Sequence, residues 1–254
     1  MSTVGTVDGK IGGQEQDMLD KEYVSIQIYN WGPCVIKLKI SDELKGLLLK
    51  HGPKGIDFRG KLAGILDNET GYTAEAKEEI IPHLAKCFGV YDQAWQKYVN
   101  KKHDKKPEYL LSALWINYQK KNEFNPPHDH DGALSFVIYL QIPEELKKEN
   151  KAYVGRSAGP GGIQFLYGDG PREAITYMSH FPEEGDMFVF PAWLKHWVSP
   201  FKSDCVRISV SGNVHDSAKL NNIERVVKNY EDKDKDTTKS GPMDPETTES
   251  GTPR

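Results

Sequence analysis

The feature that most constrains the fold is a series of short strand-like segments in the second half of the chain. Each is rich in β-branched and aromatic residues, and turns that contain Gly, Pro or charged residues separate it from the next. Several short strands at such spacing, following a helical region, indicate an all-β sandwich or barrel buttressed by helices. The predicted strands are 110–118, 134–142, 162–167, 174–179, 186–190 and 205–214.

Two helices are predicted before these strands. Ser41 is a typical N-cap followed at once by two acidic residues, which predicts a helix over 41–50. Thr73 begins a longer helix that runs toward Tyr98 with apolar residues near a 3.6-residue period, and Pro82 should kink or split it. The remaining N-terminal elements expected are strands at 23–29 and 34–40, joined by a turn at 30–33, and a loop at 52–72.

Composition sets only broad limits on function. The 254 residues fit one large domain or two small ones, and no internal segment has the composition of a linker. A net charge of −4 argues against a nucleic-acid partner. The three cysteines are odd in number and far apart, so they provide neither a disulfide framework nor a CxxC zinc site and fit a reducing cytoplasm.

The two ends of the chain differ in composition from its middle. Residues 1–20 are polar and Gly-rich, without the apolar core of a signal peptide, and residues 231–254 contain no aliphatic or aromatic side chain beyond Met243. No apolar run approaches membrane-spanning length. We therefore expect a flexible N-terminus at 1–20, one domain at 21–230 with its core at 110–214, and a disordered tail at 231–254, in a soluble cytoplasmic protein without a membrane partner.

The first chemical signal is the segment Asn125-Pro-Pro-His-Asp-His-Asp131, which directly precedes the predicted strand 134–142. In an extended segment, residues two apart face the same side, so His128 and His130 can direct both imidazoles at one point. Two converging imidazoles indicate a metal site.

The second signal is the segment 185–197, in which an apolar strand ends at Pro191 and His196 follows after a turn. A lone histidine in this position is more often a surface or core residue than a metal ligand. Beside the pair His128 and His130, the metal role is favoured, because a sandwich brings its strand ends together. We then expect His196 to supply a third ligand from across the mouth of the barrel.

The third signal is the alternating pattern of 205–212. One interpretation is a strand with one solvated face. The other places Arg207 and Ser209 inside the barrel, where a guanidinium needs a planar anion because a buried unpaired charge is very costly. A dicarboxylate co-substrate would meet that need. The alternation places Val206, Ile208 and Val210 on one side of the strand and Arg207, Ser209 and Ser211 on the other.

Together these segments resemble the iron(II)- and 2-oxoglutarate-dependent oxygenases, which share a double-stranded β-helix, or jelly-roll, fold. In that family an H-x-D/E pair and a distal His hold the metal, and an Arg or Lys about ten residues later binds the far carboxylate of 2-oxoglutarate. Here His128, His196 and Arg207 match in order and separation, and Arg207-Ile-Ser209 is similar to the R-x-S pattern of the family. The combination is most similar to a prolyl-hydroxylase-like subgroup of bacteria and their phages, and it covers roughly 110–214.

The resemblance implies a mainly β, double-stranded β-helix enzyme that couples 2-oxoglutarate decarboxylation to oxidation of a substrate C–H bond, as a hydroxylase does. It implies Fe(II) as cofactor, with 2-oxoglutarate and O2 as co-substrates, and no catalytic residue beyond the metal site. His130 stands where the family has an acid, so we expect a three-histidine site with Asp131 as the alternative ligand. The implied metal ligands are His128, His130 and His196, and the implied 2-oxoglutarate contacts are Arg207, Ser209, Tyr139 and Asn117. Tyr139 is equally well interpreted as a packed core tyrosine.

Two other functions fit parts of the pattern. A cupin-type metal dioxygenase without 2-oxoglutarate would use three histidines and the spacing of Gly185, Pro191 and His196, but no Glu follows His130 at the cupin distance. A non-catalytic jelly-roll module for binding or assembly would retain the histidines without using them. The substrate is expected to be a peptide or a small molecule, in the host cytoplasm if the protein is phage-encoded, and the sequence does not define an oligomeric state.

Overall fold

The computed structural model describes residues 32–103, 105–168 and 177–217. The chain divides into two compact units, 1–216 and 217–254, and the fold given below is that of the first unit. The predictions for 1–20, for the strand at 23–29 and for 231–254 lie outside the described residues.

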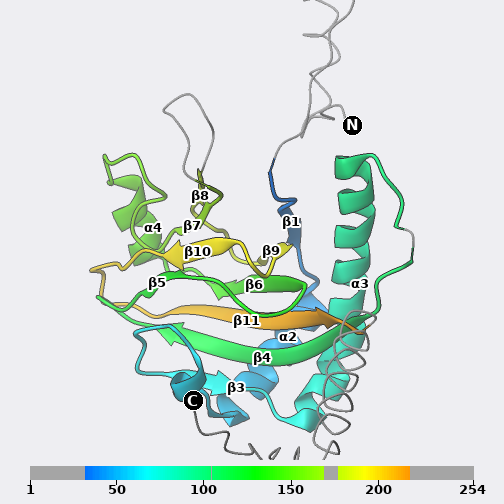
Figure 1. The fold of residues 1–254 in the computed structure, drawn as a ribbon. Helices are drawn as coiled ribbons and strands as arrows, with labels where there is room; N and C mark the ends of the chain where they lie inside the picture. Colours follow the sequence, from blue (N-terminus) through cyan, green and yellow to red (C-terminus); the bar gives the residue numbers. More distant parts are fainter. Residues whose placement is uncertain (1–31, 104, 169–176, 218–254) are drawn as a thin grey trace, which may run out of the picture. The chain divides into compact units, whose positions relative to one another are not determined.

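The strands of the described ranges form two antiparallel sheets (Figure 1). The larger sheet has seven strands in the order β1-β9-β6-β11-β4-β3-β2, and the smaller has four in the order β5-β10-β7-β8. Most neighbouring strands within each sheet come from distant parts of the chain, as in a double-stranded β-helix, so the predicted mainly β jelly-roll is confirmed. The strands are β1 (Ile36–Lys39), β2 (Ile56–Asp57), β3 (Glu69–Gly71), β4 (Tyr109–Gln119), β5 (Asn125–His128), β6 (Leu134–Gln141), β7 (Ile163–Leu166), β8 (Tyr177–His180), β9 (Asp186–Pro191), β10 (Lys195–Val198) and β11 (Arg207–Asp216).

The predicted strands correspond closely to β1, β4, β6, β7, β9 and β11. Strand β8 overlaps the end of the predicted strand 174–179, whose beginning lies outside the described residues. Strand β5 and helix α4 (Glu144–Lys151) were not predicted. Two consecutive prolines in β5 give the appearance of a turn, and α4 is short, highly charged and buries only Leu146.

Two N-terminal helices, α2 (Asp42–His51) and α3 (Ala74–Val99), are confirmed together with their predicted caps. Ser41 Oγ accepts a hydrogen bond from the backbone N–H of Leu44, and Thr73 Oγ1 accepts one from that of Ala76. Of the two effects predicted for Pro82, a kink or a split, the split is wrong, because α3 runs through the proline. No helix in the described ranges is long and apolar enough to span a membrane.

The segment 52–72, predicted as a loop, contains short regular elements instead. They are two single-turn 3-10 helices, η1 (Gly52–Lys54) and η2 (Arg59–Lys61), and the strands β2 and β3. Strand β3 pairs with β4, so that Glu69 lies opposite Asn117. Three residues are too few to show an alternating pattern, and backbone pairing with a distant strand supplies the order instead.

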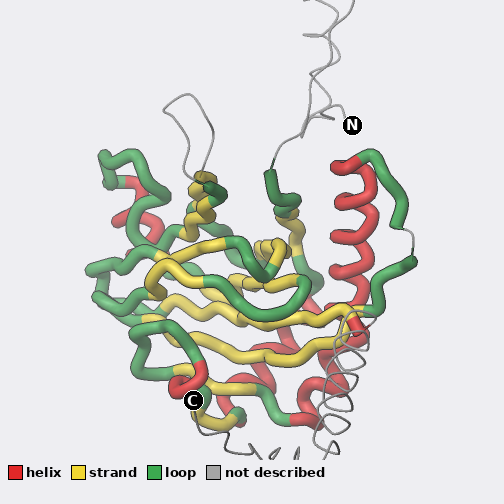
Figure 2. Tube along the Cα trace, in the orientation of Figure 1, coloured by secondary structure: helices red, strands yellow, loops and turns green. Residues whose placement is uncertain are grey.

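The described residues form three layers (Figure 2). Helices α2 and α3 make up the first layer, the seven-stranded sheet the second and the four-stranded sheet the third. Residues of β6 alternate between the two interfaces, with Phe136 and Ile138 toward the helices and Val137 and Tyr139 toward the smaller sheet. The N-terminal helices therefore buttress the barrel as predicted. The helix-side core is formed mainly by Leu44, Leu48, Ile80, Leu84, Phe88, Ile116, Phe136, Ile138, Met187, Val189 and Val210, and the inner core by Val137, Tyr139, Ile142, Ile163, Phe165, Phe188, Phe190, Leu194 and Val198.

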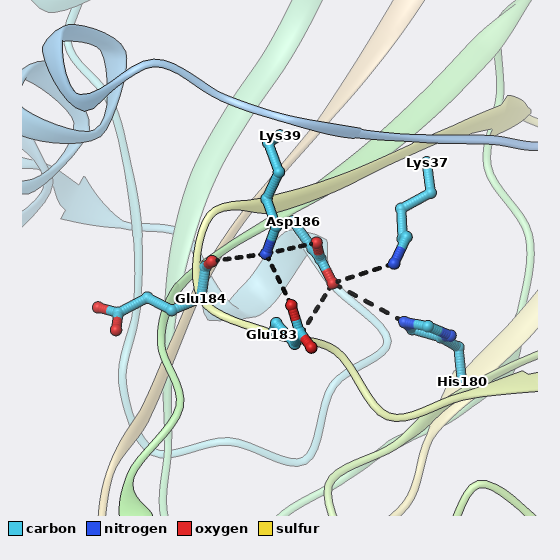
Figure 3. Close-up of polar contacts among 6 residues, drawn as sticks. All are labelled: Lys37, Lys39, His180, Glu183, Glu184 and Asp186. Atoms are coloured by element: carbon cyan, nitrogen blue, oxygen red, sulfur yellow. Dashed lines mark hydrogen bonds and ion pairs between the residues drawn. The ribbon is translucent and has the colours of Figure 1, made fainter.

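A buried carboxylate at the beginning of β9 joins three strands (Figure 3). Asp186 Oδ1 lies 2.9 Å from Lys39 Nζ of β1, and Oδ2 lies 3.8 Å from His180 Nε2 of β8. Lys37 Nζ is 3.9 Å from the same Oδ2, which also accepts the backbone N–H of Glu183 at 2.9 Å. The two lysines and the backbone N–H of Glu183 compensate the burial of this charge, so the cluster fastens β1 to β9, with His180 of β8 beside it.

Candidate metal and co-substrate site

Three histidines meet at the junction of β5 and β10. His128 ends β5, and its Cα partner across the antiparallel pair is His196 of β10. The backbone N–H of His130, two residues beyond β5, donates to the carbonyl of Ala192 in the turn between β9 and β10, at 3.0 Å. The expected place of His196 across the barrel mouth is thus wrong, since it lies on the strand next to His128.

The imidazoles surround a single point. Their candidate ligand nitrogens all lie within 4.8 Å of one another. Nδ1 of His128 is 2.7 Å from the carbonyl of Pro126, and Nδ1 of His196 is 2.9 Å from the carbonyl of Leu194. Because a carbonyl only accepts, each Nδ1 carries the proton, and each Nε2 is left with a free lone pair. This hydrogen bond to Nδ1 is the usual way in which a protein orients a metal-binding imidazole.

Burial keeps the three imidazoles neutral. Loss of hydration lowers the pKa of His128, lowers that of His130 to about 4 and lowers that of His196 to about 3. The neighbouring His128 lowers the pKa of both His130 and His196 further. At neutral pH each ring therefore has the uncharged form that a metal requires.

The acids of this segment lie outside the histidine cluster. Asp129 and Asp131 are both exposed, and the group of convergent ligand atoms contains neither of them. Asp131, the alternative ligand, is therefore not placed for coordination in this conformation. Among the described residues the donor set is three neutral nitrogens, in which His130 stands in the acid position of the family.

Aromatic side chains enclose the histidine cluster. The rings of Phe190 and Phe165 lie 4.8 and 6.0 Å from that of His196, and the Trp115 ring lies 5.8 Å from that of His130. These contacts exclude water on two sides and fix the orientation of the imidazoles.

Arg207 supplies a positive charge at the beginning of β11, where it is only 1% exposed. Its Nη1 donates to the carbonyl of Gly161 at 2.8 Å, while its Nε has no partner. No carboxylate among the described residues forms an ion pair with it, and burial lowers the pKa of the guanidinium. The guanidinium also lies 5.4 Å from the ring centre of Tyr139. The interpretation of β11 as a strand with one solvated face is wrong.

A row of polar side chains crosses the inner face of the seven-stranded sheet. Cα pairing places Tyr139 of β6 opposite Ser209 of β11, Ser209 opposite Asn117 of β4, and Asn117 opposite Glu69 of β3. Each of the four is at most 4% exposed. Asn117 Nδ2 is 3.5 Å from the hydroxyls of both Ser209 and Ser211. The Tyr139 hydroxyl, Asn117 Oδ1 and Glu69 Oε2 have no hydrogen-bond partner.

Glu69 is the one member of this row that the sequence did not suggest. It lies in the segment predicted as a loop, and a single acid in a Gly- and Asp-rich stretch carries no signal of burial. Only the pairing of β3 with β4 brings it to the inner face.

One cavity connects the histidine cluster with the polar row. Because the imidazoles and the guanidinium line the same space, a single small molecule can contact both. Its polar lining is His128, His130, His196, Arg207, Ser209, Ser211, Asn117, Asn125 and Glu69.

Fold and cavity together give a jelly-roll protein in which a group of three histidines that could hold a metal adjoins a buried, unpaired arginine. Residues 113–213 match the family described as "Putative 2OG-Fe(II) oxygenase". The matched region, which runs from β4 to β11, is similar to the oxygenases that are named for their use of Fe(II) and 2-oxoglutarate.

Several solved structures resemble the chain at low sequence identity. One is an oxidoreductase of the 2OG-Fe(II) oxygenase family from Burkholderia pseudomallei, at 12% identity and a TM-score of 0.49, with 85% of this chain and 94% of that chain covered. The viral collagen prolyl hydroxylase from Paramecium Bursaria Chlorella virus-1 has 18% identity, a TM-score of 0.45 and coverages of 71% and 94%. A Pseudomonas putida prolyl-4-hydroxylase has 13% identity, a TM-score of 0.46 and coverages of 71% and 91%. A search of curated proteins finds no match.

The residues of the cavity fit these cofactors. Three neutral imidazoles that converge on one point suit a divalent first-row metal. The unpartnered Nε of Arg207, which lines the cavity, is a buried donor that suits a carboxylate, and Tyr139, whose ring centre lies 5.4 Å from the guanidinium, carries a second unpartnered donor next to the cavity wall.

Proposed function

We propose that this protein is a hydroxylase in which His128, His130 and His196 hold Fe(II) and Arg207 and Ser209 hold the far carboxylate of 2-oxoglutarate. The observation that carries the proposal is the buried Arg207, which has no counter-anion among the described residues and lines the same cavity as the three histidines. Removing a guanidinium from water costs free energy. Neither a cupin-type dioxygenase nor a non-catalytic module requires a buried guanidinium that would justify this cost.

His128 and His196 would hold the metal through Nε2, because their Nδ1–H groups are engaged with backbone carbonyls, and His130 would be the third ligand. When bound, Fe(II) supplies the activation of O2 that oxidises a substrate C–H bond while 2-oxoglutarate is decarboxylated. The contribution of the protein is to orient the ligands and to exclude water with the aromatic residues around His196.

The co-substrate end of the cavity is formed by side chains from three neighbouring strands. Arg207 offers a charged donor. Ser209, two residues further along β11, and Tyr139, its Cα partner on β6, offer hydroxyl groups. Asn117 stands beside Ser209 and positions its hydroxyl. A carboxylate in this place would accept from the guanidinium and the hydroxyls, which would satisfy donors that are otherwise unpartnered.

The substrate and the compartment are further parts of the proposal. A cavity within the barrel favours a small molecule or a single side chain of a peptide over a nucleic acid, in agreement with the net charge of −4. Three free cysteines support a cytoplasmic location.

The test is the absorption band that Fe(II) and 2-oxoglutarate form together under anaerobic conditions, followed by succinate formation when O2 is admitted. We expect Arg207→Gln to weaken 2-oxoglutarate binding about 10- to 100-fold, because it removes a buried charge-assisted contact. Arg156→Gln removes an exposed arginine and is the matched control. An unchanged affinity in folded Arg207→Gln protein would refute the co-substrate assignment, and a wild-type protein without the band would refute the proposed function.

A further inference from the structure

A second buried charge lines the cavity, at the end away from Arg207. Glu69 belongs to β3, two strands from β11, so it lies about 10 Å from Ser209 along the sheet. Gly71, on the same face of β3, pairs with Trp115, whose ring lies 5.8 Å from that of His130. Glu69 therefore flanks the His130 side of the histidine cluster, and the co-substrate residues flank the other side.

The carboxyl group of Glu69 is buried without compensation. The residue is 2% exposed, and its Oε2 has no hydrogen-bond partner. Within the part of the chain that the structure describes, no cation forms an ion pair with it. The positive charge that acts on it comes from Arg59, but Asp57 already binds that guanidinium at 2.7 and 2.9 Å.

The surroundings of Glu69 do not favour a second negative charge. Loss of hydration and the nearby carboxylate of Glu123 raise the pKa of Glu69 to about 7. Burying a carboxyl group without a hydrogen-bond partner costs free energy whether the group is ionised or protonated. Such groups are found at functional sites, where a ligand can supply the missing partner.

The neighbouring loop lies close to the carboxyl group. A Cβ atom on Gly64 would lie 2.8 Å from Glu69 Oε1 and 2.5 Å from Asn125 Oδ1, so the loop backbone is within contact distance of both side chains. Leu62 and Ala63 of the same loop line the cavity beside Glu69. The carboxyl group thus lies in a partly apolar part of the cavity.

We propose that Glu69 is a specificity-determining residue that binds a cationic nitrogen of the substrate, an amine or a guanidinium. The inference rests on the proposed function, because it requires that the substrate occupies the His130 side of the metal site. Arg207 is a buried cation that an anionic co-substrate completes, and Glu69 is a buried anion that a cationic substrate group completes. Each end of the cavity thus holds a buried charge that a ligand group of the opposite charge would neutralise.

The experiment compares capped amino-acid probes by anaerobic calorimetry on protein mixed with Fe(II) and 2-oxoglutarate. The cationic probes are N-acetyl-lysine and N-acetyl-arginine methylamides, and the neutral ones are the norleucine and citrulline analogues. In wild-type protein we expect the cationic probes to bind at least about tenfold more tightly than their neutral analogues. In Glu69→Gln we expect this preference to fall to about twofold or less.

Asp67→Asn is the matched control, because it removes one nearby, exposed negative charge outside the cavity and leaves the pair of Asp57 and Arg59 intact, so it should keep the preference. If Glu69→Gln does not fold, Glu69→Asp decides, since withdrawing the carboxylate by one methylene should reduce the preference at least about threefold. A wild-type protein without the preference, or a Glu69 variant that keeps it, overturns the proposal. Loss of the Fe(II)–2-oxoglutarate band counts against the proposed function alone, because the probe titration does not depend on the band.

Discussion

Single buried polar groups without partners are the clearest functional marks in this molecule. Most buried polar atoms in proteins are hydrogen-bonded, so each exception calls for a reason. Arg207 Nε, the Tyr139 hydroxyl and Glu69 Oε2 are such exceptions, and all three belong to the inner face of the same sheet. Their concentration there distinguishes a binding site from a set of packing defects.

Tyr139→Phe tests whether the unpartnered hydroxyl serves a ligand or the fold. Because this hydroxyl has no partner, its removal should leave the free energy of unfolding unchanged within about 0.5 kcal/mol, or raise it. The affinity for 2-oxoglutarate should fall about three- to tenfold. Tyr72→Phe is the control: its buried hydroxyl donates to the carbonyl of Leu48 at 2.9 Å, so about 1 kcal/mol of stability should be lost with 2-oxoglutarate binding intact. The reverse pattern would make Tyr139 a packing residue.

Glu69→Gln should change the pH dependence of stability. The pKa of Glu69 is raised from 4.5 to about 7 by burial and by Glu123 and Asp57, against the opposing charge of Arg59. The folded state therefore keeps a proton that the unfolded state has released between those values, so stability falls as pH rises through this window. Glutamine cannot ionise, so the variant should gain about 2 kcal/mol relative to wild type between pH 5 and pH 8 in urea unfolding. Equal pH profiles for Glu69→Gln and the exposed control Glu78→Gln would contradict this.

At the scale of elements, the sequence predicts what local pattern determines and misses what long-range pairing determines. The alternation of β11 and the caps of α2 and α3 are local, and they were predicted. Strand β3 has three residues and owes its order to β4, and two of the four residues of β5 are prolines, so neither has a pattern of its own. For the same reason the sequence indicates the histidines and Arg207 but not Glu69.

Helix α3 shows that packing can override a local break. Pro82 lacks an N–H and should interrupt the helix, yet Ile80 and Leu84 on either side are fully buried against the barrel. The apolar face holds the helix continuous at a local cost. Pro82→Ala should therefore raise the free energy of unfolding by about 1 kcal/mol or more, as measured by urea denaturation. Lys86→Ala, an exposed change in the same helix, should stay within about 0.5 kcal/mol. A destabilised Pro82→Ala protein would show that the proline fits its place.

At the scale of the whole domain, the site joins the two sheets. His128 and His196 belong to the four-stranded sheet, whereas Arg207, Ser209 and Tyr139 belong to the seven-stranded one. A metal held by one sheet and a co-substrate held by the other would cross-link them through the cavity that both line. Ligands that bind only the folded state stabilise it by mass action, so loading should be visible as a rise in melting temperature.

Zn(II) or Mn(II) at about 100 times its dissociation constant should add about 2.7 kcal/mol, which corresponds to a rise of about 5–10 °C for a domain of this size. 2-Oxoglutarate should add a further shift only when metal is present, because its chelating end has no partner without it. His196→Ala should abolish the metal-dependent shift, whereas His83→Ala, a histidine on the outer helix α3, should retain it. A shift with 2-oxoglutarate alone, equal to that with metal, would mean that the two ligands bind independently and that the cavity does not couple the sheets.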